Sequence, residues 1–244
     1  MPLLIFNGIG ANMELLEPLL CALQGIETIV FDLPGTGGSA LRKSPYRISG
    51  LARLAERLLR KLGYTAPVDV LGVSWGGALA QQFAHSYPQH CRRLVLAATT
   101  PGVLMVPGSP FLLAKLIAPR RYGDPKYLLK IAPDLYGGEV RRDPSVIMAY
   151  MARLKRPHWL GYLYQQLAFC GWSSLLWLPR LRQPTLVLAG RDDPLAPLAN
   201  SRILAWLIPR AKLHIVNDGH LFLTTGSQSA TPLIRQFLSA RAHP

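Results

Sequence analysis

Short apolar runs alternate with longer helical patterns along most of this chain, and this alternation most constrains its fold. The predicted strands are residues 3–6, 28–31, 68–71, 93–97, 185–189 and 212–216. The predicted helices are residues 13–23, 48–62, 76–86, 200–207 and 232–240. Several strands are almost wholly apolar, as expected for strands that are covered on both faces. We therefore predict an α/β fold, with a mostly parallel sheet and helices on both of its faces.

The alternation is interrupted between residues 101 and 180. This stretch is rich in proline and aromatic residues and contains no convincing strand. It separates the fourth and fifth predicted strands. Long inserted segments in compact domains commonly form lids or binding surfaces. We predict a core of residues 1–100 and 181–244, interrupted by a helical lid at residues 101–180.

Composition excludes several other classes of protein. Half of the 244 residues are apolar and 16% are charged, so the chain is not intrinsically disordered. The net charge of +14 favours an anionic partner such as nucleic acid or a lipid surface. The sequence contains no zinc-finger spacing and no RNP aromatic pair, so we expect no nucleic-acid binding. Solubility is the alternative explanation of the charge.

Three further features bear on the cellular compartment. Residues 159–179 carry no charge and could cross a bilayer by length alone, but their glutamines, serines and glycines favour a buried or interfacial helix over a transmembrane span. The N-terminus lacks the pattern of a signal peptide. Cys21, Cys91 and Cys170 are too far apart for a disulfide framework. We interpret them as core residues of a protein in a reducing compartment.

The sequence Gly-Val-Ser-Trp-Gly-Gly at residues 72–77 lies between a predicted strand and a predicted helix. This is a G-x-S-x-G pattern in a strand–turn–helix context. Its glycines permit a sharp, strained turn that neighbouring backbone approaches closely, and such a turn presents the serine hydroxyl at the start of the helix. We predict that Ser74 is a nucleophile.

A nucleophilic serine needs a general base, and the base needs a carboxylate that orients it. His220 follows the last predicted strand, at the carboxyl edge of the sheet where Ser74 also lies, and is the predicted base. The carboxylate is expected in the loop after the fifth strand. Asp193 is favoured there over its neighbour Asp192 because a proline follows Asp193 four residues later. Asp218, two residues before His220, is a weaker alternative.

Negative charge develops on the carbonyl oxygen when a serine adds to it, so two backbone N–H groups must already point at that oxygen. One is predicted at Trp75, directly after the nucleophile. The other is predicted at Ile9, because the glycines on both sides of it let its amide turn inward. Chemistry of this kind requires no metal ion and no organic cofactor.

Several long sequence strings resemble one family. They are residues 3–12, 72–85 and 218–223, together with Met105-Val106-Pro107-Gly108 and Tyr136-Gly137-Gly138. With these strings the chain resembles the α/β hydrolases and, more specifically, the intracellular medium-chain-length poly(3-hydroxyalkanoate) depolymerases. The resemblance implies a serine hydrolase that cleaves storage polyester at granule surfaces in the cytoplasm, with Ser74, Asp193 and His220 as its catalytic triad.

A water-insoluble polyester with aliphatic side chains needs an apolar docking surface. Aromatic residues of the predicted lid are candidate substrate contacts, although most aromatic residues in such a segment pack in a core; the candidates are Phe111, Trp159, Trp172 and Trp177. Basic residues of the same segment are candidates for attracting an anionic granule coat, with a solvated surface as the alternative; they are Arg120, Arg121, Arg141, Arg142, Arg153, Lys155 and Arg156.

Three other functions remain open at this point. An acyltransferase would use the same triad and oxyanion hole. A broad carboxylesterase would act on short soluble esters. A granule-coat protein without activity would retain only the fold, and the intact triad argues against it.

The chain also opens inside its first predicted strand, without the preceding β-hairpin usual in such hydrolases, so we expect that the reading frame has lost residues at its start. The strand at residues 28–31 would then lie at an uncovered edge.

Overall fold

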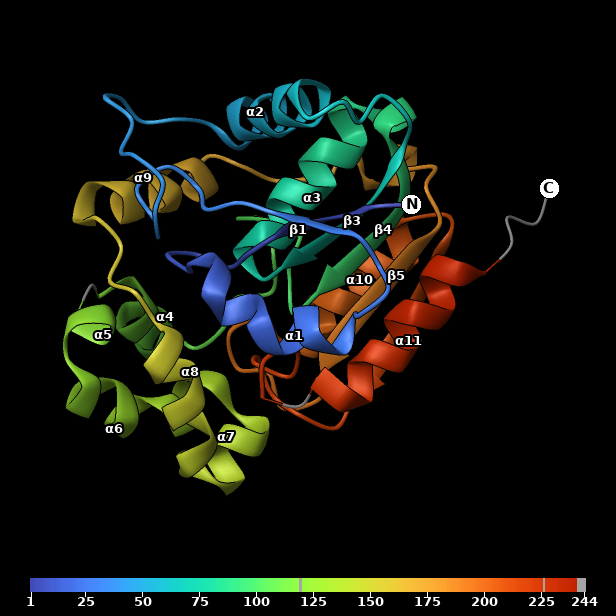
Figure 1. Ribbon diagram of the computed structural model, residues 1–244. Coiled ribbons are helices and arrows are strands. Elements are labelled where there is room, and N and C mark those ends of the chain that lie inside the picture. Colours follow the sequence, from blue (N-terminus) through green and yellow to red (C-terminus); the bar gives the residue numbers. More distant parts are fainter. Residues whose placement is uncertain (119, 226, 241–244) are drawn as a thin grey trace.

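Figure 1 shows the computed structural model, which describes residues 1–118, 120–225 and 227–240. Residues 119, 226 and 241–244, which belong to the predicted lid and core, lie outside the described residues. The division into core and lid stays a prediction.

In the described part of the chain, six strands form one sheet in which every pairing is parallel. The strands are β1 (Leu3–Phe6), β2 (Thr28–Val30), β3 (Val68–Val73), β4 (Cys91–Ala97), β5 (Thr185–Gly190) and β6 (Ala211–Val216). Their order across the sheet is β2-β1-β3-β4-β5-β6, so β2 lies at one edge. Each predicted strand is present, and the predicted α/β fold is confirmed.

Helices cover both faces of this sheet (Figure 1). One face is covered by α2 (Ile48–Lys61), α3 (Trp75–Ser86) and α10 (Leu198–Leu207), and the other by α1 (Glu17–Ala22) and α11 (Ser227–Ser239). Strand β1 shows why both faces need covering. Its Leu4 and Phe6 pack in the core under α2 and α3, whereas Leu3 and Ile5 pack under α1 and α11, because successive side chains of a strand point to opposite faces.

The sequence of α2 explains its position on the sheet. Leu51, Ala55 and Leu59 recur at spacings of four residues and are buried. Basic side chains occupy the opposite, exposed face. Such an apolar stripe directs one side of a helix toward a core.

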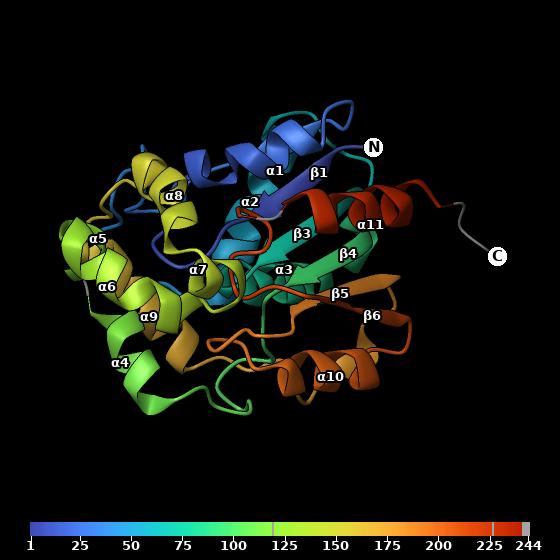
Figure 2. The same cartoon turned by 90° about the horizontal axis from the view of Figure 1, so that it is seen from below.

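Residues 101–180, named the helical segment from here on, connect β4 to β5. The segment contains α4 (Pro110–Ile117), α5 (Arg120–Gly123), α6 (Pro125–Tyr136), α7 (Gly138–Arg142), α8 (Ile147–Arg153) and α9 (Trp159–Cys170). These helices lie beyond the carboxyl ends of the strands (Figure 2). The two ends of the segment meet, because Gly102 and Ser173 form an antiparallel bridge and the Ser174 N–H donates to the Pro101 carbonyl at 2.9 Å.

The expectation that all three cysteines are core residues is wrong for two of them. Cys91 is buried in β4, but Cys21 and Cys170 are exposed. Each exposed cysteine lies in the last turn of its helix, α1 or α9. At these positions a side chain faces solvent even though its residue type is usually buried.

The uncharged stretch 159–179 is not one long helix. It consists of α9, a turn and a 3₁₀ helix at Leu178–Arg180. No helix in the described ranges is both long enough and apolar enough to cross a membrane.

Most of the basic side chains proposed to attract an anionic coat are engaged in ion pairs. The pairs are Arg120–Asp124, Arg141–Asp192, Arg142–Glu139, Arg153–Glu17 and Lys155–Glu14. Arg121 is buried. Because neighbouring carboxylates offset these charges locally, the basic residues of the helical segment are weak candidates for binding an anionic surface.

Candidate active site

Ser74 lies in a strained turn between β3 and α3. Its backbone has φ 54° and ψ −120°, a conformation that is uncommon for any residue other than glycine. Two neighbours hold it there. The Ser74 N–H donates to the carbonyl of Ala97 at 2.8 Å, and the Thr99 hydroxyl donates to the Ser74 carbonyl at 2.7 Å. Both neighbours belong to β4 or the residues that follow it, so the adjacent strand fixes the turn.

Close packing explains the glycine at position 76. A Cβ atom there would overlap the backbone carbonyl oxygens of Phe6 and Asn7. Helix α3 therefore begins directly against the end of β1 and the loop that follows it. Ile9, in that loop, and Trp75, at the start of α3, line the same cavity as Ser74.

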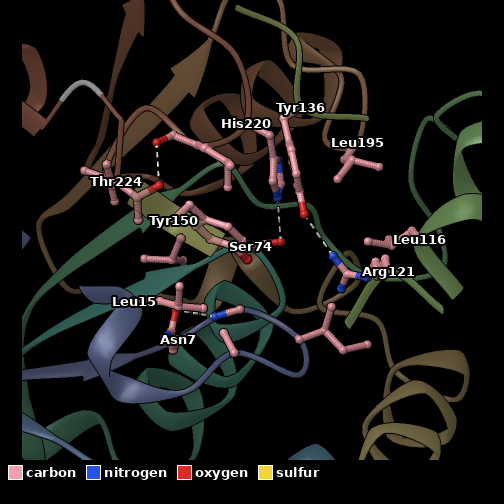
Figure 3. A pocket seen from close by; sticks show the side chains of 16 residues that line it. Asn7, Leu15, Ser74, Leu116, Arg121, Tyr136, Tyr150, Leu195, His220 and Thr224 are labelled. Atoms are coloured by element: carbon pink, nitrogen blue, oxygen red, sulfur yellow. Dashed lines mark hydrogen bonds between the residues drawn. The ribbon is translucent and has the colours of Figure 1, made fainter. Parts of the chain in front are cut away.

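A chain of hydrogen bonds connects Ser74, His220 and Asp193 across three loops. Figure 3 shows the one between Ser74 and His220. His220 Nε2 lies 3.0 Å from Ser74 Oγ, and His220 Nδ1 lies 2.8 Å from Asp193 Oδ2. Asp193 is buried, and its Oδ1 accepts the backbone N–H groups of Leu195 and Ala196 at 2.9 and 2.8 Å. The imidazole is thus held between a fixed carboxylate and the serine hydroxyl.

The other two candidate carboxylates do not contact the histidine. Asp192 points outward, where it accepts from Arg141 and from the Gly138 N–H. Asp218 accepts from the N–H groups of Gly219 and Glu139 and so braces the loop. No group of three His, Cys, Asp or Glu side chains that could hold a metal ion occurs among the residues that the structure describes.

Tyr136, at the end of α6, is a contact of His220 that sequence reasoning missed. Its carbonyl accepts the His220 N–H at 2.7 Å, and its ring lies nearly parallel to the imidazole, with a centroid distance of 6.5 Å. The signal in the sequence was the glycine pair that follows it. Gly138 has φ 52°, and a Cβ atom there would overlap the Gly219 N–H, so the helical segment can pass this close to the histidine loop.

The two backbone amides predicted to form an oxyanion hole lie beside Ser74. Within the described residues, neither the Ile9 nor the Trp75 N–H has a hydrogen-bond partner in the protein. Their surroundings are fixed by the helical segment. Buried Gln165 accepts the Gly10 N–H at 2.8 Å, and its carbonyl accepts the Trp75 indole N–H at 3.0 Å. Gln165 was also missed, although a buried polar residue in an otherwise apolar helix was a usable signal.

An apolar cavity of about 360 Å³ opens next to Ser74. Ser74, His220 and Ile9 line this cavity together with apolar side chains of the helical segment. These side chains are Met105, Leu113, Leu116, Ile117, Leu163, Leu167 and Phe169. A second cavity of about 60 Å³ also borders Ser74 and is lined in part by Tyr136, Tyr150 and Arg121 (Figure 3).

The four aromatic residues predicted to contact substrate do not line either cavity. Trp172 and Trp177 pack against α3 instead: the Trp172 indole donates to Gln82 at 2.8 Å, and Trp177 stacks on His85 at 4.3 Å. Phe111 and Trp159 are 67% and 61% exposed. Aliphatic side chains, rather than these aromatic ones, form the wall of the cavity.

Comparisons with known proteins agree with this geometry. A model of the α/β hydrolase fold matches residues 1–227, and the chain belongs to this family. The thermophilic esterase of Thermogutta terrifontis has a similar structure, with a TM-score of 0.83 and 26% identity over 98% of this chain and 89% of that one.

Two curated relatives match over most of their length. The chain is 54% identical to the poly(3-hydroxyalkanoate) depolymerase of Ectopseudomonas oleovorans, over 97% of this chain and 84% of the relative. It is 31% identical to the pimeloyl-[acyl-carrier protein] methyl ester esterase of Aromatoleum aromaticum, over 89% and 90%. The first match confirms the resemblance predicted from the sequence strings.

The packing at Gly76 can be tested by substitution. We expect Gly76→Ala to lower the free energy of unfolding by about 2 kcal/mol or more, because backbone atoms of β1 and its loop must move. Gly50→Ala is the matched control. Gly50 is exposed in α2 with no atom near its Cβ position, so alanine should raise stability by up to about 1 kcal/mol. Urea denaturation measures both; equal stability of Gly76→Ala and the wild type would contradict the packing argument.

Proposed function

We propose that this protein is a serine hydrolase that cleaves the ester bonds of medium-chain-length poly(3-hydroxyalkanoate) through an acyl-enzyme intermediate. The observation that carries the proposal is the unbroken hydrogen-bond chain from Ser74 through His220 to Asp193 beside an apolar cavity. The depolymerase from Ectopseudomonas oleovorans, 54% identical, supports the substrate class.

In the first step, Ser74 Oγ attacks the carbonyl carbon of a backbone ester while His220 Nε2 accepts its proton. Asp193 keeps the imidazole in the orientation that faces the serine and stabilises its cationic form. The N–H groups of Ile9 and Trp75 donate to the oxygen that becomes negative. Their orientation is set before the reaction, so no reorganisation is needed when charge develops.

In the second step, the alcohol end of the cleaved chain takes the proton from His220 and leaves. Water then enters, His220 accepts one of its protons, and the resulting hydroxide attacks the acyl-enzyme. Collapse of this second tetrahedral intermediate returns the proton to Ser74 and releases the acid. The same oxyanion-hole donors serve both steps.

The apolar cavity favours a substrate with an aliphatic acyl group, which would bind beside Ser74. Leu113, Leu116 and Leu163 place hydrocarbon around a volume of about 360 Å³ next to the reactive serine. A cavity of this size lies in the range that binds drug-sized molecules. Burial of each methylene group contributes about 0.8 kcal/mol, so alkyl side chains of medium length bind more favourably than short ones.

We expect Ser74→Ala to lower release of 3-hydroxy acids from purified aliphatic polyester by about 10⁶-fold, because the nucleophile is removed. Ser86→Ala, at the far end of α3, is the control, and we expect it to release 3-hydroxy acids at the normal rate. Mass analysis of the released acids, with and without an added hydroxyacyl acceptor, distinguishes hydrolysis from acyl transfer. Undiminished turnover by Ser74→Ala would refute the triad.

A bulkier side chain in the cavity should shorten the preferred acyl chain. We expect Leu163→Trp to lower kcat/KM for p-nitrophenyl decanoate by about 10-fold relative to p-nitrophenyl butyrate, the effect of losing room for a few methylene groups. Leu176→Trp is the control, since Leu176 is 83% exposed and lies outside both cavities. An unchanged ratio in Leu163→Trp would remove this cavity from acyl binding.

The helical segment is proposed to act as a lid that docks on the polyester granule. Helix α4 supports this idea because it is strongly apolar yet contains no fully buried residue. Its end contacts α9 at the cavity, where Tyr162 and Gln166 donate to the carbonyls of Leu116 and Ile117. Several apolar side chains of the helical segment are exposed, and some of them line the cavity; they include Leu104, Phe111, Ile117, Leu163 and Leu167, of which the last three belong to the lining. An apolar face of this kind suits a hydrophobic polymer surface.

Removal of one exposed aromatic residue from this face should weaken docking. We expect Phe111→Ser to lower partition onto purified polyester granules by about 10-fold, the effect of losing one large buried side chain. Trp206→Ser is the matched control, because Trp206 is 82% exposed on α10, outside the helical segment. Equal losses in the two variants, each normalised to its soluble-ester turnover, would contradict docking through α4.

A further inference from the structure

A buried cation lines the smaller cavity beside Ser74. Arg121, in α5, is 4% exposed and borders this cavity of about 60 Å³ together with Ser74, His220 and Tyr136 (Figure 3). A guanidinium group stays charged inside a protein. An isolated buried charge is costly unless it is paired or well hydrogen-bonded.

The protein supplies no anion for this charge. Arg121 donates to the hydroxyls of Tyr136, Tyr122 and Tyr162. Among the described residues, no carboxylate forms an ion pair with it, and its Nε has no hydrogen-bond partner. Burial raises the pKa of the Tyr122 and Tyr150 phenols well above its ordinary value, so these groups remain neutral.

We propose that Arg121 binds a carboxylate of the substrate, namely the free carboxylate at the end of a polyester chain. The inference rests on the proposed function of the site. Binding of this carboxylate makes the enzyme selective for chain ends, since interior units of the polymer carry no carboxylate. The small cavity, of about 60 Å³, has room for a carboxylate group, because one water molecule needs only about 10–15 Å³ of volume measured in the same way.

The chemistry of a 3-hydroxyalkanoate ester fits this arrangement. The terminal carboxylate carbon is separated by four covalent bonds from the carbonyl carbon of the last ester, a span of about 5 Å. Ser74 and Arg121 border one cavity, so both groups can be engaged at once. The bond that breaks joins this carbonyl carbon to the 3-oxygen of the terminal unit. That oxygen takes the proton from His220, and the terminal 3-hydroxy acid leaves with its carboxylate at Arg121.

A purely structural role for Arg121 makes a different prediction. Its Cζ lies 4.3 Å from the Tyr122 ring centroid and 5.8 Å from that of Tyr162, so it also contributes cation–π contacts to the helical segment. Loss of those contacts alone would affect charged and uncharged substrates equally. The ratio of the two substrates therefore separates carboxylate binding from structural support.

The test compares the dimer of 3-hydroxyoctanoate with its methyl ester. In the Ser74→Ala background, calorimetric titration should give a Kd for the free acid about 10- to 100-fold lower than for the methyl ester, as expected for charge-assisted hydrogen bonds. With Ser74 present, kcat/KM should show a preference of similar size. Arg121→Gln should reduce both ratios to about one, and Arg121→Lys, which keeps the charge but not the planar donors, should give intermediate ratios.

Arg120→Gln is the matched control, because it removes an equal charge from the adjacent, exposed position and should leave both ratios unchanged. Ratios that stay near the wild-type value in Arg121→Gln, or a wild type without preference for the free acid, would overturn the inference. If Arg121→Gln does not fold, the Arg121→Lys ratios decide in the same way. Failure of the wild type to release acid from purified polyester as well as from both dimers would overturn the proposed function, whereas an Arg121-dependent difference in Kd would still establish the carboxylate site.

Discussion

The candidate site depends on the backbone of Ser74 being held at a positive φ. Such a conformation costs about 1–3 kcal/mol and persists only where surrounding contacts enforce it. Here the neighbouring strands do so. Phe6 pairs with Gly72, and Val73 pairs with Ala97, so the register of β1, β3 and β4 determines where the serine hydroxyl lies. The contact of Gly76 with the end of β1 then fixes the Ile9 amide relative to that hydroxyl.

The helical segment contributes to this geometry from the other side. Tyr136 contacts His220 through its ring and its carbonyl, and Tyr122 donates to the Ile9 carbonyl at 2.5 Å. Gln165 holds the Gly10 amide. His220 and the proposed oxyanion-hole loop at Ile9 and Gly10 therefore both contact residues of α5, α6 or α9. Arg121 donates hydrogen bonds to the hydroxyls of Tyr136 and Tyr122, so a buried charge belongs to the same contact network.

The sheet and the approximate place of the site followed from local sequence signals. Apolar runs define buried strands, and parallel strands end at one edge, so the loops containing Ser74, Asp193 and His220 had to converge. The choice between Asp192 and Asp193 depended on the direction of each side chain, and the structure shows only Asp193 at the imidazole. The positions of Trp172 and Trp177 depended on packing between distant segments, which residue type alone does not specify. The contacts of Gln165 and Tyr136 depended on the same kind of packing, so a glutamine in an apolar stretch and a glycine pair marked these positions without specifying their partners.

The central claim is that Ser74 carries an acyl group during ester cleavage. The most direct measurement is mass spectrometry of the protein after rapid mixing with a 3-hydroxyoctanoate oligomer and acid quenching within the first turnover. We predict an added mass equal to the acyl portion of the substrate, located on the peptide that contains Ser74. Rapid release of acid without any adduct on that peptide, or with an adduct on a different side chain, would contradict the account.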